Sequence, residues 1–246
     1  MNSKEIIRTF IFGVGRLLNC TEASRVVYYH DIHIREKYTP MSTAFNLFKT
    51  QINVIRQEHF SIVRDINSVE NQIQVAFDDG FRGIWECAEW LVAEKIYPTI
   101  FIPISLIGQK GYLSASEIVA LHNVGFNIQS HGVRHSNMSI MPMDKLTNDL
   151  QSSKQYLEDL LGKEINGVCF PQGYFSDIVI SKAQQLGYTE LYASFPRRYL
   201  LDNPLKGRSL FQSLSPLQVR LAIHGGMDIL MEHYRRLHYN TKRFYQ

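Results

Sequence analysis

Short apolar runs alternate with longer amphipathic segments through most of the chain. The short runs have the length and the β-branched or aromatic content of buried strands, whereas the longer segments place apolar residues every three or four positions, as helices do. We predict strands at 26–29, 62–63, 73–77, 99–102, 126–129, 167–170 and 191–194, and helices at 43–58, 83–95, 114–125, 144–161 and 176–186. Strand and helix alternating at this spacing is typical of parallel β–α units.

Capping signals support several of these boundaries. Ser114 and Glu117 form a capping-box pattern at the start of one predicted helix. Gly162 follows the predicted helix 144–161, where a residue in a left-handed conformation commonly ends a helix. We therefore expect an α/β fold, namely a distorted (β/α) barrel of about seven strands rather than an open sheet.

No linker, repeat or low-complexity tract divides the chain. We expect residues 1–246 to form a single domain with a core at about 26–195, an N-terminal helix within 1–24 and a C-terminal extension at 197–246. No interpretable motif stands in that extension, where Arg208 is expected to be at most a structural partner.

Composition and charge exclude some classes of protein. The 246 residues are 45% hydrophobic and 20% charged, which suits a globular chain with a sizeable core. The net charge is only +3, and no basic stripe is present, so we expect no nucleic-acid partner. Cys20, Cys87 and Cys169 contain no CxxC pair, which favours free thiols in a reducing compartment.

Within the first twenty residues, apolar side chains predominate from Ile6 to Leu18, but Arg8 and Arg16 interrupt them. A secretory signal needs an uninterrupted apolar stretch and a cleavage site, and neither is well formed here. We interpret the segment as an amphipathic helix that packs on the domain, with peripheral membrane contact as an alternative. The expected location is the cytoplasm, with contact to the inner face of the membrane left open; the sequence does not indicate an oligomeric state.

Polar residues follow four of the predicted strands directly. His30 follows the first, Asp78 and Asp79 follow the strand 73–77, His131 follows 126–129, and Gln172 lies just after 167–170. Because the carboxyl ends of parallel strands meet at one rim, these side chains are expected to lie close together.

His131 and His135 are four residues apart, so a helical turn would point both imidazoles to one side. Together with Asp79 they offer two nitrogen ligands and one carboxylate, a set that leaves positions open for water and substrate. The expected cofactor is one divalent metal ion: zinc first, with cobalt, nickel or manganese as alternatives. Taken alone, each motif has a plainer reading, because the histidines could cap a turn and Asp-Asp-Gly is good turn chemistry.

Three segments resemble the motifs of the polysaccharide deacetylases, the NodB-homology carbohydrate esterases. Segment 75–81 reads VAFDDGF and resembles their TFDDG motif; segment 130–137 reads SHGVRHSN and resembles H-S/T-x-x-H; segment 170–173 reads FPQG and resembles R-x-P-Y-G. The resemblance covers about 26–195 and implies a distorted (β/α) barrel. It further implies that Asp78 is the general base and that Asp79, His131 and His135 bind the metal.

The chain departs from these motifs in the third segment. Cys169 occupies the position of the family's arginine, which helps to orient the base, so Asp78 must be held by another group or by none. Gln172 replaces the tyrosine whose backbone N–H is assigned to the oxyanion, and a backbone donor survives a change of side chain.

The general acid has two candidates. His224 in the segment LAIHGG resembles the family's last motif, but it falls at the end of a predicted helix that starts at Ser215, where a histidine is often structural. His30 in the segment VVYYHD has the strand-then-histidine form, placed at the front as in the poly-N-acetylglucosamine deacetylase-like branch. We therefore favour His30.

The resemblance implies a metal-dependent hydrolase that removes the acetyl group from an N-acetylated sugar of a glycan or glycan precursor. Asp78 would accept a proton from the attacking water, and His30 would protonate the departing amine. Two alternatives stay open: a deformylase or deacetylase of a lipid-linked sugar, and an inactive carbohydrate-binding homologue.

Overall fold

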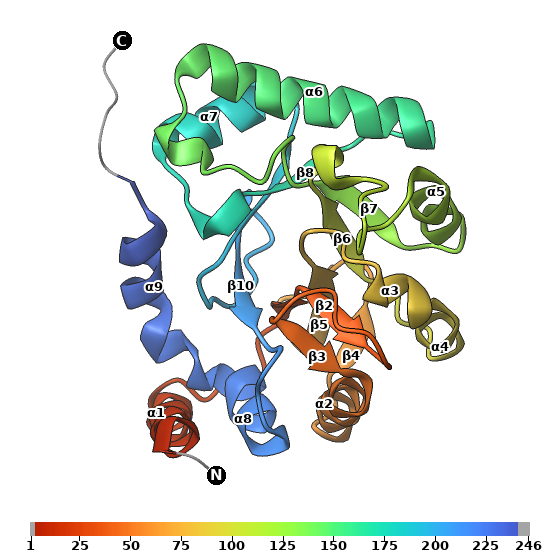
Figure 1. Cartoon of the computed structure of the whole chain (residues 1–246). Coiled ribbons are helices and arrows are strands. Elements are labelled where there is room, and N and C mark those ends of the chain that lie inside the picture. Colours follow the sequence, from red (N-terminus) through yellow and green to blue (C-terminus); the bar gives the residue numbers. More distant parts are fainter. Residues whose placement is uncertain (1–2, 241–246) are drawn as a thin grey trace.

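Seven parallel strands close into a ring, which confirms the predicted barrel. The structure, a computed structural model, describes residues 3–240 (Figure 1). Around the ring the order is β1, β10, β9, β8, β7, β6 and β5, and β5 pairs again with β1. The strands are β1 (Arg25–Tyr29), β5 (Gln72–Phe77), β6 (Thr99–Ile102), β7 (Asn127–Ser130), β8 (Gly167–Cys169), β9 (Glu190–Ala193) and β10 (Leu205–Leu210).

The barrel is distorted at β5. This strand pairs with β1 along 73–77, whereas its other edge is shared between two strands. The short strand β4 (Ser61–Val63) pairs with the first half of β5 at 72–74, and β6 pairs only with its second half at 76–77. A separate two-stranded parallel sheet, β2 (Asp31–His33) and β3 (Ser42–Ala44), follows β1.

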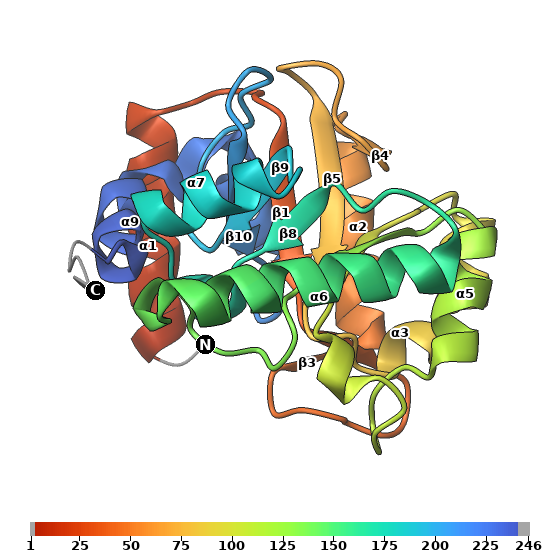
Figure 2. The same ribbon diagram turned by 90° about the horizontal axis from the view of Figure 1, so that it is seen from above.

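The helices surround the ring (Figure 1). They are α1 (Ser3–Leu18), α2 (Phe45–Gln57), α3 (Gly83–Glu86), α4 (Ala88–Ala93), α5 (Ala115–Asn123), α6 (Met143–Leu161), α7 (Asp177–Gln185), α8 (Pro216–Leu221) and α9 (Met231–His238). Figures 1 and 2 both place α1 and α9 together, on the side of the barrel away from α5. No helix within residues 3–240 is both long enough and apolar enough to cross a lipid bilayer.

Alternate residues of the strands pack on opposite faces of the barrel wall, as the pleat requires. Val26 and Tyr28 belong to a small cluster inside the barrel, together with Phe101 of β6. Their neighbours Val27 and Tyr29 belong to the larger cluster that also contains the buried residues of the helices. Because both faces are buried, the strands carry the nearly continuous apolar runs that the sequence analysis detected.

Most elements begin and end within a few residues of their predicted positions, and the capping box of Ser114 and Glu117 is present. Gly162 adopts the left-handed conformation, with φ of 64°, at the end of α6. The predicted helix 83–95 is instead broken into α3 and α4 at Cys87. The sequence pattern did not indicate β10 or α9, which both lie in the segment 197–246.

Helix α1 is the helix expected within 1–24, and it packs against the chain after α8. Phe12 and Gly15 are its buried residues. Gly15 faces a π-helical turn at Ala222–Gly226, and a Cβ added at Gly15 would lie 2.2 Å from the carbonyl oxygen of Gly226. The close approach of the two backbones therefore depends on the missing side chain.

Two glycine-to-alanine changes in α1 test this packing. Gly15→Ala should lower the free energy of unfolding by about 1–3 kcal/mol, because α1 must move away from the turn. Gly13→Ala has no neighbouring atom within 4 Å of the added Cβ. It should raise the stability by up to about 1 kcal/mol, because alanine favours the helix. Urea denaturation of both variants measures the difference; equal effects would contradict the packing.

Candidate metal centre and catalytic pocket

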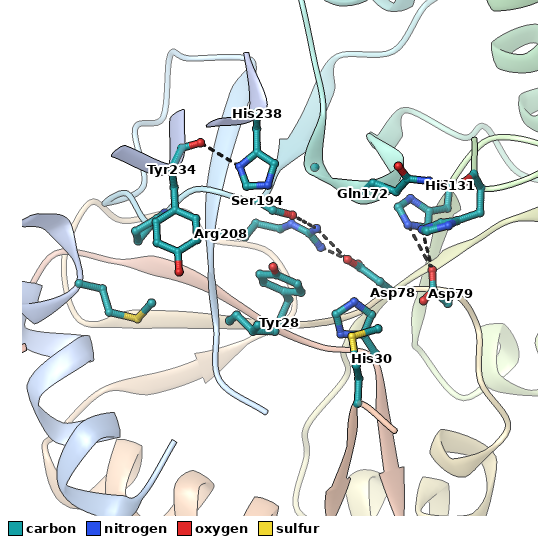
Figure 3. Close-up of a pocket in the computed structure, with 16 residues that line it drawn as sticks. Tyr28, His30, Asp78, Asp79, His131, Gln172, Ser194, Arg208, Tyr234 and His238 are labelled. Atoms are coloured by element: carbon teal, nitrogen blue, oxygen red, sulfur yellow. Dashed lines mark hydrogen bonds and ion pairs between the residues drawn. The ribbon is translucent and has the colours of Figure 1, made fainter. Parts of the chain in front are cut away.

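A pocket of about 330 Å³ opens at the carboxyl ends of the barrel strands. All six site residues predicted from the sequence line it: His30, Asp78, Asp79, His131, His135 and Gln172. Figure 3 shows Asp79 and His131 at one end of the pocket, Tyr234 and His238 at the other, and Asp78 with Arg208 between them. The structure thus brings together side chains that lie up to 142 positions apart, as 172 minus 30 gives for Gln172 and His30.

The three predicted metal ligands converge on one point. Oδ1 of Asp79 lies 3.1 Å from Nε2 of His135 and 3.5 Å from Nε2 of His131. The two imidazole ring centres are 4.9 Å apart. Ligand atoms that share one tetrahedral or octahedral ion at a bond length of about 2.1 Å lie roughly 3.0–3.4 Å from each other, so this spacing suits a single ion.

Two features of the site fit a divalent cation. Oδ1 of Asp79 is a buried oxygen that has no hydrogen-bond donor among the described residues, which is costly for a carboxylate unless a cation compensates it. Nδ1 of His131 lies 2.7 Å from the carbonyl oxygen of Cys169, so this nitrogen carries the proton. Its Nε2 is the nitrogen that faces Asp79 and would bind a cation, the arrangement that orients a metal-binding histidine.

The sequence analysis considered a helical turn that would point both imidazoles to one side. His131 and His135 do not lie on such a turn. The segment after β7 is an irregular turn in which Gly132 and His135 have positive φ. Asp149 of α6 holds this turn by accepting a hydrogen bond from the backbone N–H of Val133 at 3.0 Å. The imidazoles still meet because α6 fixes the loop, and not because of helical periodicity.

A second group of potential ligands, Asp78, His131 and Cys169, also lies close together. Arg208 occupies this position, because its guanidinium contacts both oxygens of Asp78 and lies 2.9 Å from Sγ of Cys169. Burial also raises the pKa of the Cys169 thiol, which keeps the sulfur protonated. A positive guanidinium and a neutral thiol disfavour a cation here, so the group with Asp79 is the candidate metal site.

Asp78 forms a buried, bidentate ion pair with Arg208 of β10. The two nitrogen–oxygen distances are 2.6 and 2.8 Å, and both residues are at most 4% exposed. The guanidinium also stacks over the ring of Tyr28 at 4.3 Å. Arg208 is thus the group that holds Asp78 in place of the arginine missing at position 169, and not merely a structural partner.

This ion pair controls the pKa of Asp78. Burial by itself raises that pKa, but the charge and hydrogen bonds of Arg208 outweigh burial and lower it from 3.8 to about 2. Because the folded value lies below the unfolded one, the pair contributes about 2 kcal/mol of stability above about pH 4. That contribution disappears as the pH falls through about 2, and Asp78 is ionised at any physiological pH.

The backbone is strained at the site. Among the described residues, six non-glycine residues have positive φ, and three of them are Asp79, His135 and Gln172, with φ of 70°, 52° and 59°. Such conformations cost of order 1 kcal/mol or more each and persist only when the surroundings enforce them. Their concentration in one pocket indicates that the positions of these side chains are selected for function.

His30 lies in the pocket, and Gln212 orients it. Nδ1 of His30 is 2.8 Å from Oε1 of Gln212, so Nδ1 donates to this oxygen, and Nε2 has no hydrogen-bond partner within residues 3–240. His224 lies elsewhere: its Nε2 is 3.0 Å from Oε2 of Glu58 and its ring packs on Phe60. Of the two candidate acids, only His30 is positioned in the pocket.

Gln172 follows β8 in a tight turn at Pro171–Gly173. Its side chain reaches out towards the backbone of His135, with Nε2 3.4 Å from that carbonyl oxygen. Its backbone N–H has no acceptor within residues 3–240. This N–H remains available as a donor to a ligand in the pocket.

Several residues in the pocket or directly beside it were not predicted from the sequence. Arg208 and Gln212 lie in or just after β10, and Tyr234 and His238 come from α9. Residues 205–210 read LKGRSL, which lacks the apolar run of the other strands. The sequence contained one indication of Arg208: Asp78 had no predicted partner, and its negative charge required a cation from another part of the chain.

Comparison with known proteins identifies the same region. A family model described as polysaccharide deacetylase matches residues 65–191. YxkH of Bacillus subtilis (strain 168) is 21% identical over 135 residues, and the peptidoglycan-N-acetylmuramic acid deacetylase PdaA of the same organism is 23% identical over 131 residues. These alignments cover 54% and 52% of this chain and 48% of each relative, so the chain spans about half the length of the curated relatives it matches.

The fold also matches solved structures. The Streptococcus pyogenes deacetylase PplD, solved in complex with acetate, superposes with a TM-score of 0.72 at 18% identity. The match covers 82% of this chain and 99% of PplD. At this level of identity the likeness establishes the fold, and the chemistry must be argued from the residues of this pocket.

Metal binding can be tested without a substrate. We expect the protein to bind one zinc ion and Asp79→Ala and His131→Ala to weaken binding by at least about 100-fold, since each change removes a ligand. His224→Ala is the matched control, because His224 lies outside the pocket and should leave the affinity unchanged. Calorimetric titration and metal analysis provide the readout, and wild-type affinity in Asp79→Ala would contradict the assignment.

Proposed function

The chain belongs to the polysaccharide deacetylase family, and on that premise we propose that it is a divalent-metal-dependent hydrolase that removes the acetyl group from an N-acetylated sugar. The observation that supports this most strongly is the pairing of two adjacent carboxylates with different partners. Asp79 faces two imidazoles, and Asp78 is held ionised by Arg208. A cation site directly beside an ionised carboxylate can polarise an amide carbonyl and activate a water molecule for its hydrolysis.

We propose that Asp79, His131 and His135 hold the ion. The two nitrogens and one oxygen suit zinc, with cobalt, nickel or manganese as alternatives. When bound, such an ion supplies Lewis acidity for the amide carbonyl and lowers the pKa of water towards about 7. The protein contributes the open side of the site, which faces the pocket that contains His30 and Gln172.

Asp78 acts in this proposal as the general base. Arg208 fixes both carboxylate oxygens, so that the carboxylate can accept the proton of a water molecule without rotating. A carboxylate with a pKa of about 2 is a weak base, but it is always ionised and it is correctly placed. Asp78 therefore depends on a water molecule whose pKa a bound cation would already have lowered.

His30 and Gln172 act on the other atoms of the amide. His30 donates from Nδ1 to Gln212, which leaves Nε2 to deliver a proton to the departing amine. The backbone N–H of Gln172 is the proposed donor to the oxyanion, a contact worth about 2.7–4 kcal/mol where it has been measured in other enzymes. The products are acetate and a free amino sugar.

Acetate release from N-acetylglucosamine oligosaccharides by the zinc-loaded protein is the direct test. Asp78→Asn keeps the shape of the side chain but cannot accept the proton. It should lower kcat by about 10²–10⁴ while zinc still binds with wild-type stoichiometry. Wild-type protein that binds zinc and sugar but releases no acetate would instead support the alternative of an inactive carbohydrate-binding homologue.

The pH profile tests the role of Arg208. Burial raises the pKa of Asp78, and without the guanidinium only the smaller effects of His131 and His30 oppose it, so this pKa should rise in Arg208→Gln. Because Asp78 works only when ionised, activity is lost as the pH falls through its pKa. We therefore expect a new acidic limb of kcat/KM at higher pH in the variant, measured between about pH 4 and pH 9.

Arg208→Lys is the matched control for this experiment. It retains the positive charge, so its acidic limb should lie between those of the wild type and Arg208→Gln. Circular dichroism must show that the variants fold, because an unpaired buried carboxylate costs about 3–5 kcal/mol. Profiles of folded variants that superpose on the wild type would refute the assigned role.

A further inference from the structure

A second cavity, of about 310 Å³, lies next to the catalytic pocket, between α1 and the segment 210–234. Leu210, Met227 and Tyr234 line both cavities, so the two share a wall. Figure 3 shows Tyr234 at the end of the catalytic pocket that lies away from the metal site. We call this second cavity the α1 groove; its other lining residues are Lys4, Ile7, Arg8, Ile11, Phe12, Ser213, Leu214 and Leu230.

The walls of the α1 groove are mainly aliphatic. Ile7 and Ile11 contribute from α1, and Leu214 and Leu230 contribute from the opposite side. Ile7 is 58% exposed although it faces this cavity. Such walls provide few partners for sugar hydroxyl groups, whereas an alkyl chain is stabilised when its methylene groups are buried against them.

The charged residues of the groove carry one sign. Lys4 and Arg8 line it, and no carboxylate is among the residues that line it. Arg8 is held in place, because it donates to Oγ and to the carbonyl oxygen of Ser213 at 3.1 and 2.8 Å. A fixed guanidinium beside an ammonium group suits a phosphate group.

We propose that the α1 groove binds the alkyl or prenyl chain of an amphiphilic substrate, whose phosphate group contacts Lys4 and Arg8. The N-acetylated sugar of the same molecule lies in the catalytic pocket, on the far side of the shared wall. This inference rests on the proposed deacetylase function and narrows its substrate class to sugars carried on an apolar chain. It follows from the three lining residues that the two cavities share and from the charge of the second cavity.

Alkyl phosphates test the groove without any catalysis. Decyl phosphate, used below its micellar concentration, should bind at least about tenfold more tightly than ethyl phosphate in calorimetric titrations. Ile7→Glu places a carboxylate in the groove and should remove this difference. Leu17→Glu is the matched control, because Leu17 is 86% exposed on the same helix and lies about 15 Å further along it, outside the groove.

Three results would overturn the proposal. The first is equal binding of the two phosphates by the wild type. The second is an equal loss in Leu17→Glu, which would indicate adsorption to the helix surface in general. The third is a change of oligomeric state in Ile7→Glu, measured by sedimentation velocity, which would identify the groove as an interface between copies of the chain.

Turnover separates this proposal from the proposed function. The zinc-loaded protein should deacetylate decyl N-acetylglucosaminide with a kcat/KM at least about tenfold above that of the methyl glycoside, and Ile7→Glu should remove the preference. Equal turnover of both glycosides would refute the α1 groove and leave the deacetylase function intact. If decyl phosphate binds but no N-acetylated sugar releases acetate, the deacetylase function is refuted, and the α1 groove remains a binding site for an alkyl chain.

Discussion

The site depends on how the like charges of two neighbouring carboxylates are compensated. Asp78 and Asp79 are both buried, and two like charges at this separation destabilise each other unless each has its own compensation. The barrel supplies two separate partners: the guanidinium of Arg208 for Asp78, and the imidazoles of His131 and His135, with the cation they can hold, for Asp79. These different partners give the two carboxylates different chemistry: Asp78 is ionised and fixed, and Asp79 is available as a ligand.

The strand that closes the barrel therefore also contributes to the pocket. Strand β10 completes the ring by pairing with β9 and β1, and in doing so it brings Arg208 next to Asp78. Just after β10, Gln212 orients His30. A change that opened this part of the barrel would remove the partner of Asp78 and the partner of His30 together.

The segments outside residues 65–191 contribute the remaining residues of the pocket. The ligands of the proposed metal ion, Asp78 and Gln172 all lie within the matched region. His30, Arg208 and the α1 groove lie outside it, because they come from the chain before β5 and after β9. The shared wall of Leu210, Met227 and Tyr234 connects the two parts, and this is where the size and polarity of a substrate would be selected.

The sequence by itself determined the parallel α/β architecture and the residues at the strand ends, because apolar periodicity and the motifs around Asp78 and His131 are local features that survive without coordinates. Only the tertiary structure decided which groups meet. The strand 205–210 is polar, so no apolar periodicity predicts it. Arg208 pairs with Asp78, which lies 130 positions away in the sequence. The turn at His135 was equally hidden, because a contact with α6 sets it and local sequence does not encode long-range contacts.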